Sequence, residues 1–168
     1  MNKVKFGIAG YGKMGKIREE SILNSPDTKL ISIYEVSECR HNDKDIVQCN
    51  SFDELLATDI DAVIVSAYVS VAADYVIRAL NAGKHVFCEK PPSMTAKEMQ
   101  KVIETEKKMG RVLKYGFNHR FHYSVMEAKK IINNGSLGKM LWMRGVYGKA
   151  GSIDFHDNWR NYKNYSGG

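Results

Sequence analysis

Cysteine is scarce in this sequence, and long apolar runs are missing from it. The three cysteines, Cys39, Cys49 and Cys88, are odd in number and show no CxxC spacing, which excludes a disulfide or zinc framework and indicates a reducing compartment. No apolar stretch approaches the roughly 20 residues that a helix needs to cross a bilayer, and the N-terminus shows no signal-peptide pattern. We therefore expect a cytoplasmic protein without a membrane anchor.

A dense basic run is missing as well. The formal charge is +6, but the lysines and arginines are spread along the chain and form no patch that could follow a phosphate backbone, so we expect no nucleic-acid partner. With 43% hydrophobic and 26% charged residues, the composition is that of an ordinary globular protein. A length of 168 residues accommodates one full domain and part of another.

Short apolar runs alternate with helix-forming segments over most of the chain. The predicted strands are 4–9, 30–34, 62–67, 85–88 and 112–115. The predicted helices are 13–24, a short helix opened by the capping-box pair Ser51 and Glu54, 71–82, and one that runs from the second capping-box pair, Thr95 and Glu98, to Met109. Parallel neighbours need crossover connections, so this alternation predicts a doubly wound, Rossmann-type α/β fold with helices on both faces of a parallel sheet.

The pattern changes near residue 121. A helix to residue 133, a GSLG turn and an apolar strand at 140–147 are predicted, and the tail at 149–168 has no clear periodicity. We therefore divide the chain into a first domain at 1–120 and the start of an incomplete α+β domain at 121–168.

The strongest chemical signal is a GxGxxG fingerprint between the first predicted strand and the first helix. Gly10 permits the tight turn, Gly12 lets the backbone approach a pyrophosphate, and Gly15 allows close packing of helix on strand. Unpaired N–H groups and the helix dipole favour phosphates at that helix N-terminus. The alternative is a glycine-rich turn without a ligand, but the position between strand and helix favours a site for NAD or NADP.

Glu35 ends the second predicted strand, where an acidic residue hydrogen-bonds the adenosine ribose. A carboxylate there repels a 2′-phosphate and favours NAD over NADP. Arg40 and His41 follow closely, however, and could accommodate that phosphate. The alternative for Glu35 itself is a solvated loop glutamate. NAD is the expected cofactor, and NADP stays open.

Three strings carry a family resemblance: GIAGYGKMG at 7–15, ALNAGKHVFCEKPPSMT at 79–95 and GFNHRF at 116–121. They resemble the Gfo/Idh/MocA oxidoreductases, which act on sugars, inositols and nucleotide sugars. The resemblance implies hydride transfer between nicotinamide and a ring-hydroxyl carbon of a sugar-like substrate, with a nucleotide sugar as the preferred class. It also implies that Lys90 is the catalytic residue at the reacting oxygen and that the Lys90–Pro91 bond is cis. From the sequence alone, Lys90 would be an ordinary surface lysine in a turn.

The resemblance implies two further sets of contact residues. The expected cofactor-binding residues are Gly10, Tyr11, Gly12, Lys13, Met14, Gly15, Glu35, Ser66, Ala67, Glu89, Lys90 and Pro91. The expected substrate-binding residues are Asn118, Arg120, Trp159 and Arg160. His119 and His122 have no third clustered ligand beside them, so we expect no metal site.

The chain departs from the family pattern in two places. The string SAYVSVAAD at 66–74 lacks the usual proline and histidine, so we expect only backbone contacts with the cofactor there. The chain also stops at Gly168, before the segment where the family carries an aspartate and a histidine opposite the lysine. Two functions are therefore expected: the dinucleotide-binding part of an oxidoreductase or, as the alternative, a non-catalytic nucleotide-binding or interaction module. A homo-oligomer or a companion chain that supplies the rest of the substrate and oligomerisation domain is a further expectation.

Overall fold

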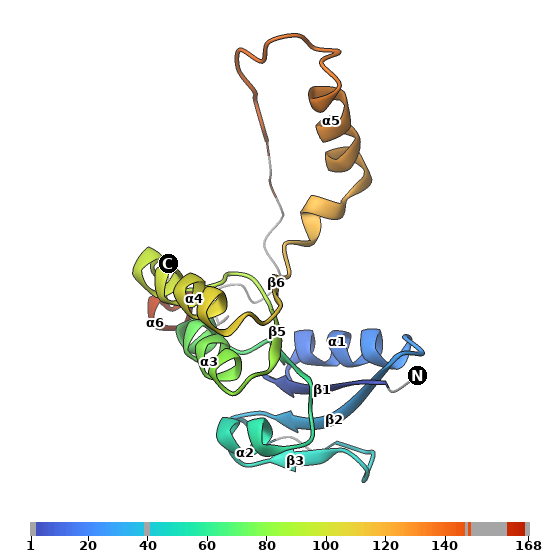
Figure 1. Ribbon diagram of the computed structural model, residues 1–168, viewed down its shortest axis with the longest axis vertical. Coiled ribbons are helices and arrows are strands. Elements are labelled where there is room, and N and C mark those ends of the chain that lie inside the picture. The colour runs from blue at the N-terminus through green and yellow to red at the C-terminus, as the bar shows by residue number, and fades with distance from the viewer. Residues whose placement is uncertain (1–2, 39–40, 147, 149–160, 167–168) are drawn as a thin grey trace. The chain divides into compact units, whose positions relative to one another are not determined.

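The computed structural model describes residues 3–38, 41–146, 148 and 161–166. Two compact units make up the chain, Met1–Gly116 with Trp159–Gly168 and, separately, Phe117–Asn158. The strands are β1 (Val4–Ala9), β2 (Thr28–Tyr34), β3 (Val47–Cys49), β4 (Ala62–Val65), β5 (His85–Cys88) and β6 (Leu113–Tyr115). The helices are α1 (Lys13–Leu23), α2 (Phe52–Ala57), α3 (Val69–Asn81), α4 (Ala96–Met109), the 3-10 helix η1 (Asn118–Phe121), α5 (Tyr123–Asn133) and α6 (Lys163–Ser166) (Figure 1).

The six strands of the first unit form one parallel sheet in the order β3-β2-β1-β4-β5-β6. Every connection between neighbours is a crossover, as parallel pairing requires. This is the predicted Rossmann-type α/β fold. The strand order reverses at β1, so the carboxyl ends of β1 and β4 meet at the switch point, where Ala9 pairs with Val65. Open α/β sheets bind their ligands at such a point.

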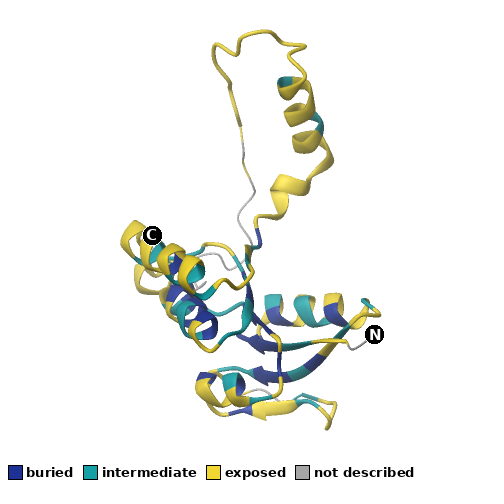
Figure 2. Cartoon of the chain, viewed as in Figure 1, coloured by how far each residue is buried: buried dark blue, intermediate teal, exposed yellow. Residues whose placement is uncertain are grey.

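Apolar side chains fill both faces of the sheet. Helices α2, α3 and α4 cover one face over a core that includes the fully buried Leu55, Leu80 and Val102. Helix α1 covers the other face, where Ile22 packs with Leu30 in a smaller cluster. Figure 1 shows α1 on one side of the strands and α3 and α4 on the other, and Figure 2 shows the buried residues concentrated between them. The sheet is therefore a rigid platform for its carboxyl edge.

Local capping signals set several helix ends where the sequence predicts them. The Ser51 hydroxyl accepts a hydrogen bond from the backbone N–H of Glu54 at the start of α2. At the start of α4, Thr95 and Glu98 form the full reciprocal capping box. Helix α4 ends at Gly110, which has φ 59° and so adopts the left-handed conformation that favours glycine.

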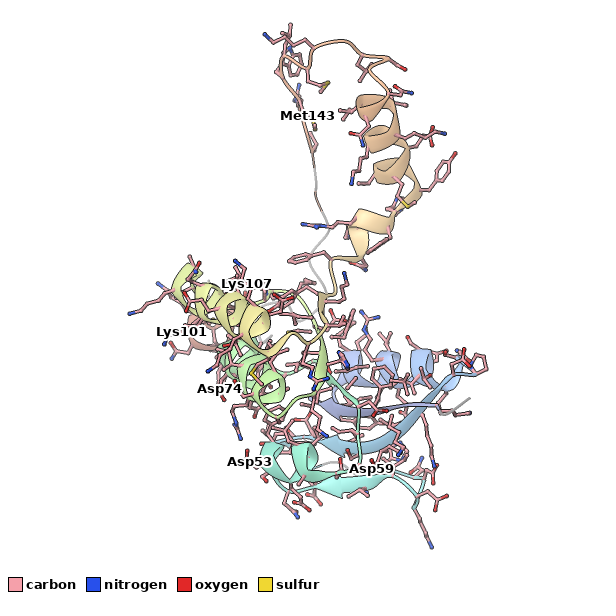
Figure 3. The ribbon with its side chains drawn as sticks, viewed as in Figure 1. Asp53, Asp59, Asp74, Lys101, Lys107 and Met143 are labelled. Atoms are coloured by element: carbon pink, nitrogen blue, oxygen red, sulfur yellow. The ribbon has the colours of Figure 1, made fainter. Side chains whose placement is uncertain are left out.

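An ion-pair bridge ties α2 to α3. Arg78 on α3 pairs with Asp53 on α2 and, at 3.3 Å between Nη1 and Oδ2, with Asp74 one turn back on its own helix. Figure 3 labels the two aspartates, Asp53 on α2 and Asp74 on α3. Its guanidinium carbon also lies 4.9 Å from the centre of the Phe52 ring. Hydrogen bonding to Asp53 is the main cause that raises the pKa of Arg78. The bridge fastens the helices behind the sheet.

The second unit differs from its prediction in one respect. Residues 140–146 form no strand, contrary to the prediction for 140–147, and residue 147 lies outside the described residues. A strand needs a hydrogen-bonding partner, and no strand of the described part of this unit is available to pair with it. Apolar β propensity alone therefore gave the wrong prediction there.

Smaller differences lie in the first unit, where β2 begins at Thr28 instead of residue 30 and β4 ends at Val65 instead of residue 67. Strand β3 was not predicted, because three residues are too few for an apolar alternation to stand out. Helix α3 begins at Val69, two residues before its predicted start at 71. Within the described part of the chain, the helices are too short or too polar to cross a bilayer.

Candidate functional site

The glycine loop between β1 and α1 is shaped by contacts that only glycine allows. Gly10 has φ 91°, and a Cβ there would lie 2.5 Å from the backbone nitrogen of Ala67. A Cβ on Gly15 would lie 2.3 Å from the carbonyl oxygen of Gly10. These two glycines therefore let the loop and the first turn of α1 lie directly against the end of β4.

Gly12 has a different environment, because a Cβ there would meet nothing within 4 Å. It is exposed and is the N-cap of α1, where no side chain caps the helix and no acidic residue lies in the first turn. Lys13 and Met14 follow it in that turn, and the Lys13 side chain is exposed. The space in front of this uncapped helix N-terminus is open, so it can accept the pyrophosphate of a dinucleotide. The N–H groups and the dipole of the helix attract such an anion.

Ser66 and Ala67 follow β4 and support the glycine loop. The Ser66 hydroxyl donates to the carbonyl oxygen of Gly10 at 2.5 Å, and its backbone N–H donates to Ala9 at 2.8 Å. The Ser66 side chain thus engages the loop itself, and only its backbone was expected to contact the cofactor. Ser66 therefore stabilises the turn at Gly10.

Glu35 directly follows β2 and is held by two backbone groups. The N–H of Tyr11 donates to Oε2 at 2.7 Å, and the N–H of Ser37 donates to Oε1 at 3.2 Å. The glycine loop and the predicted ribose-binding acid are therefore in direct contact. A carboxylate fixed beside the open helix N-terminus fits the ribose of a dinucleotide whose phosphates lie at Gly12.

The turn after β5 contains Glu89, Lys90 and Pro91, and its Lys90–Pro91 bond is cis, as predicted. Glu89 forms an ion pair with Arg18 of α1, with 2.7 Å between Nε and Oε1. Their side chains are 11% and 22% exposed, respectively, so the pair is largely shielded from water. A Cβ at Gly116 would lie 2.9 Å from Oε2 of Glu89, so the glycine leaves room for this carboxylate.

Lys90 is exposed, two residues beyond Cys88, which pairs with Val65 of β4. The ion pair of Glu89 with Arg18 thus holds the turn against α1, and Lys90 lies exposed at the carboxyl edge of the sheet. That edge is where a doubly wound fold places its ligand.

Residues 4–117 match the oxidoreductase family with an NAD-binding Rossmann fold, Gfo/Idh/MocA. The chain belongs to this family. The Gfo/Idh/MocA match covers the sheet, the glycine loop, Glu35 and the Glu89–Pro91 turn, and so confirms the predicted family and its NAD-binding fold.

Several named relatives are inositol dehydrogenases. Inositol 2-dehydrogenase of Salmonella typhimurium is 31% identical over 159 residues, which cover 89% of this chain and 47% of that protein. Myo-inositol 2-dehydrogenase of Thermotoga maritima is 30% identical, with 81% of this chain and 42% of that protein covered. The chain thus spans about half the length of the curated relatives it matches.

A solved structure also resembles the chain. The scyllo-inositol dehydrogenase of Lactobacillus casei, with bound NAD(H) and scyllo-inositol, superposes with a TM-score of 0.74. It is 28% identical, and the match covers 82% of this chain and 43% of that one.

The predicted substrate residues are distributed differently from the cofactor residues. Asn118 and Arg120 lie on η1 in the second unit and are exposed, with the Arg120 guanidinium 5.5 Å from the centre of the Phe117 ring. Trp159 and Arg160 lie outside the described residues. The role of all four stays a prediction.

Sequence reasoning missed Arg18. It lies three residues after Gly15, one turn along α1, and this spacing places both on one side of the helix. Its partner Glu89 is 71 residues away in sequence, so only the folded chain reveals the pair.

The buried cysteines beside this site are unreactive. Burial, foremost, and the nearby Glu89 raise the pKa of the Cys88 thiol to about 12. Burial likewise raises the pKa of Cys49 to about 11. Both stay protonated near neutral pH, so neither is a candidate nucleophile. Within the described residues, no group of three or more His, Cys, Asp or Glu side chains could hold a metal ion.

Proposed function

We propose that the first unit binds NAD(H) across the carboxyl ends of β1, β2 and β4, with the pyrophosphate at Gly12 and the adenosine ribose at Glu35. The observation that carries this proposal is the open, uncapped N-terminus of α1 beside a fixed carboxylate. NADH carries no 2′-phosphate and is not affected by the Glu35 charge in this way. In NADPH the Glu35 carboxylate repels the 2′-phosphate. NAD is therefore the proposed physiological cofactor.

The protein of which these units are part is proposed to oxidise or reduce a ring-hydroxyl carbon of a sugar-like substrate. Nicotinamide supplies the hydride acceptor or donor when it is bound. In carbonyl reduction the Lys90 ammonium is proposed to lie at the reacting oxygen, where it stabilises developing negative charge and donates a proton; in alcohol oxidation the proton passes the other way, from the ring hydroxyl to the Lys90 amine. Glu89 and Arg18 hold the turn from which Lys90 projects.

The proposed substrate class is a cyclic polyol of the inositol type. Support comes from the names of relatives at 30% identity and above, which shift the preference away from the nucleotide sugar expected from the sequence. Asn118, Arg120, Trp159 and Arg160 are proposed to contact the substrate, a role that the family resemblance implies.

The test is NAD⁺ reduction by the whole protein of which these units are part, with myo-inositol, scyllo-inositol and a UDP-sugar, monitored by NADH absorbance. Lys90→Ala is expected to abolish turnover while NADH affinity stays within about fivefold, because the loss of one exposed lysine contact is worth less than about 1 kcal/mol. Lys97→Ala, at an exposed position on α4, is the matched control and should retain turnover. NADH binding without turnover on any substrate would favour the non-catalytic nucleotide-binding module.

A further inference from the structure

Three side chains from separate segments meet beside the glycine loop. The Tyr11 hydroxyl donates to Oε2 of Glu19 on α1, and Nε2 of His41 lies 2.6 Å from Oε1 of the same carboxylate. The rings of Tyr11 and His41 are 5.6 Å apart. The His41 and Glu19 side chains are only 10% and 16% exposed, so Glu19 holds the connection between β2 and β3 against α1 in a largely dry contact.

The His41 ring has hydrogen-bonding partners on both nitrogens. Nδ1 lies 3.0 Å from the backbone nitrogen of Asp43 and 3.3 Å from its carbonyl oxygen, while Nε2 lies against Glu19. From its place shortly after Glu35, His41 could accommodate the 2′-phosphate of NADP. In the fold both ring nitrogens are engaged, by Glu19 and by the Asp43 backbone, so the ring is not turned toward a phosphate.

Tyr11 joins this cluster to the expected ribose site. Its backbone N–H donates to Glu35, while its buried ring and hydroxyl face His41 and Glu19. The cluster lines a cavity of about 680 Å³ between α1, β2 and residues 41–46. Lys16 also lines that cavity.

We propose that Glu19 determines cofactor choice by holding His41 away from the 2′-position of the adenosine ribose. Glu19 and His41 touch neither reacting atom and act as positioning residues, whereas Glu35 reads the ribose itself. The inference rests on the proposed dinucleotide site. It predicts that the preference for NADH over NADPH depends on a helix residue outside the glycine fingerprint and outside β2.

The experiment is a fluorescence titration of the purified chain with NADH and with NADPH, which needs no turnover. In Glu19→Ala the ratio of the NADPH to the NADH dissociation constant should fall about fivefold, the order expected for one new exposed charge pair. Glu20→Ala removes the same charge from the next position on α1, where the side chain is exposed, and should leave the ratio unchanged. Adding His41→Ala to Glu19→Ala should restore the original ratio, because the gain is assigned to His41.

The outcomes separate this inference from the function on which it rests. If the unaltered chain binds neither dinucleotide, the proposed function fails. If it binds NADH but Glu19→Ala leaves the ratio unchanged, or Glu20→Ala lowers it equally, the inference is wrong. Glu19→Leu keeps much of the side-chain volume without an oxygen acceptor, so it serves if the alanine variant does not fold. An unchanged ratio in a folded Glu19→Leu variant, with Tyr11 and His41 retained, also contradicts the inference.

Discussion

The two units use apolar residues in opposite ways. In the first unit Leu80 and Val76 are fully buried between α3 and the sheet. In the second unit Leu141 is 82% exposed and Val146 is 86% exposed, and none of its described residues is buried. Figure 2 shows this contrast as dark blue within the sheet and yellow along α5 and the segment after it. Both units thus contain apolar side chains. Among the described residues, only the first unit has a sheet and helices that bury them.

The contrast also separates what each unit contributes to stability. In the first unit every strand pairs with at least one neighbour, and helices cover both faces. Helix α5 in the second unit has no buried residue. The free energy of unfolding should therefore come almost entirely from the first unit.

A matched pair of leucine substitutions gives the largest expected difference. Leu80→Ala should lower the free energy of unfolding by about 2–5 kcal/mol, because it leaves a cavity in a fully buried core. Leu141→Ala should change it by about 0.5 kcal/mol or less, because the side chain is already in water. Urea denaturation followed by circular dichroism measures both, and equal effects would contradict the contrast between the units.

A matched pair of glycine substitutions should give a smaller effect. Both Gly10 and Gly138 have positive φ, at 91° and 63°. Gly10→Ala should cost about 3 kcal/mol, since strain adds to the collision with the end of β4, whereas Gly138→Ala should cost about 1 kcal/mol from strain alone. Thermal unfolding checks the order, and a larger loss in Gly138→Ala would show that the second unit is the more tightly packed.

Arg18→Met tests the ion pair behind the Lys90 turn. It should lower the free energy of unfolding by about 1–2 kcal/mol, because Glu89 loses its partner while it stays largely shielded from water. Arg144→Met, at an exposed position of the second unit, is the control and should have almost no effect. If both variants unfold at the same urea concentration, the Arg18–Glu89 pair contributes nothing to the fold.

Thiol chemistry gives the smallest effect on the protein itself. Cys88 and Cys49 should resist iodoacetamide at pH 8 in the folded chain and react in urea, as mapped by peptide mass spectrometry. Because folding raises both pKa values above 9.0, stability should fall as the pH rises from about 9 to 11, where only the unfolded thiols ionise. Rapid alkylation of Cys88 in the native chain would contradict its burial.

Local signals predicted much of the first unit and of its candidate site. The glycine spacing, the capping box at Thr95 and Glu98, and the cis bond before Pro91 each depend on residues close together in sequence or on a family string. The pairs Arg18–Glu89 and Glu19–His41 depend on distant segments that meet only in the fold, so no spacing rule finds them. The strand predicted at 140–147 failed over 140–146 because pairing is not a property of the segment itself.

The central claim is that the open N-terminus of α1 binds a dinucleotide, and titration of NADH into Gly12→Val tests it most directly. Gly145→Val is the matched control, because a Cβ there also meets nothing within 4 Å and its φ is not positive. We predict saturable NADH binding in the unaltered chain and in Gly145→Val. In Gly12→Val the NADH dissociation constant should rise about tenfold or more, because the charge-assisted contacts to the pyrophosphate are lost. Equal affinities in the two valine variants would contradict a dinucleotide site at this loop.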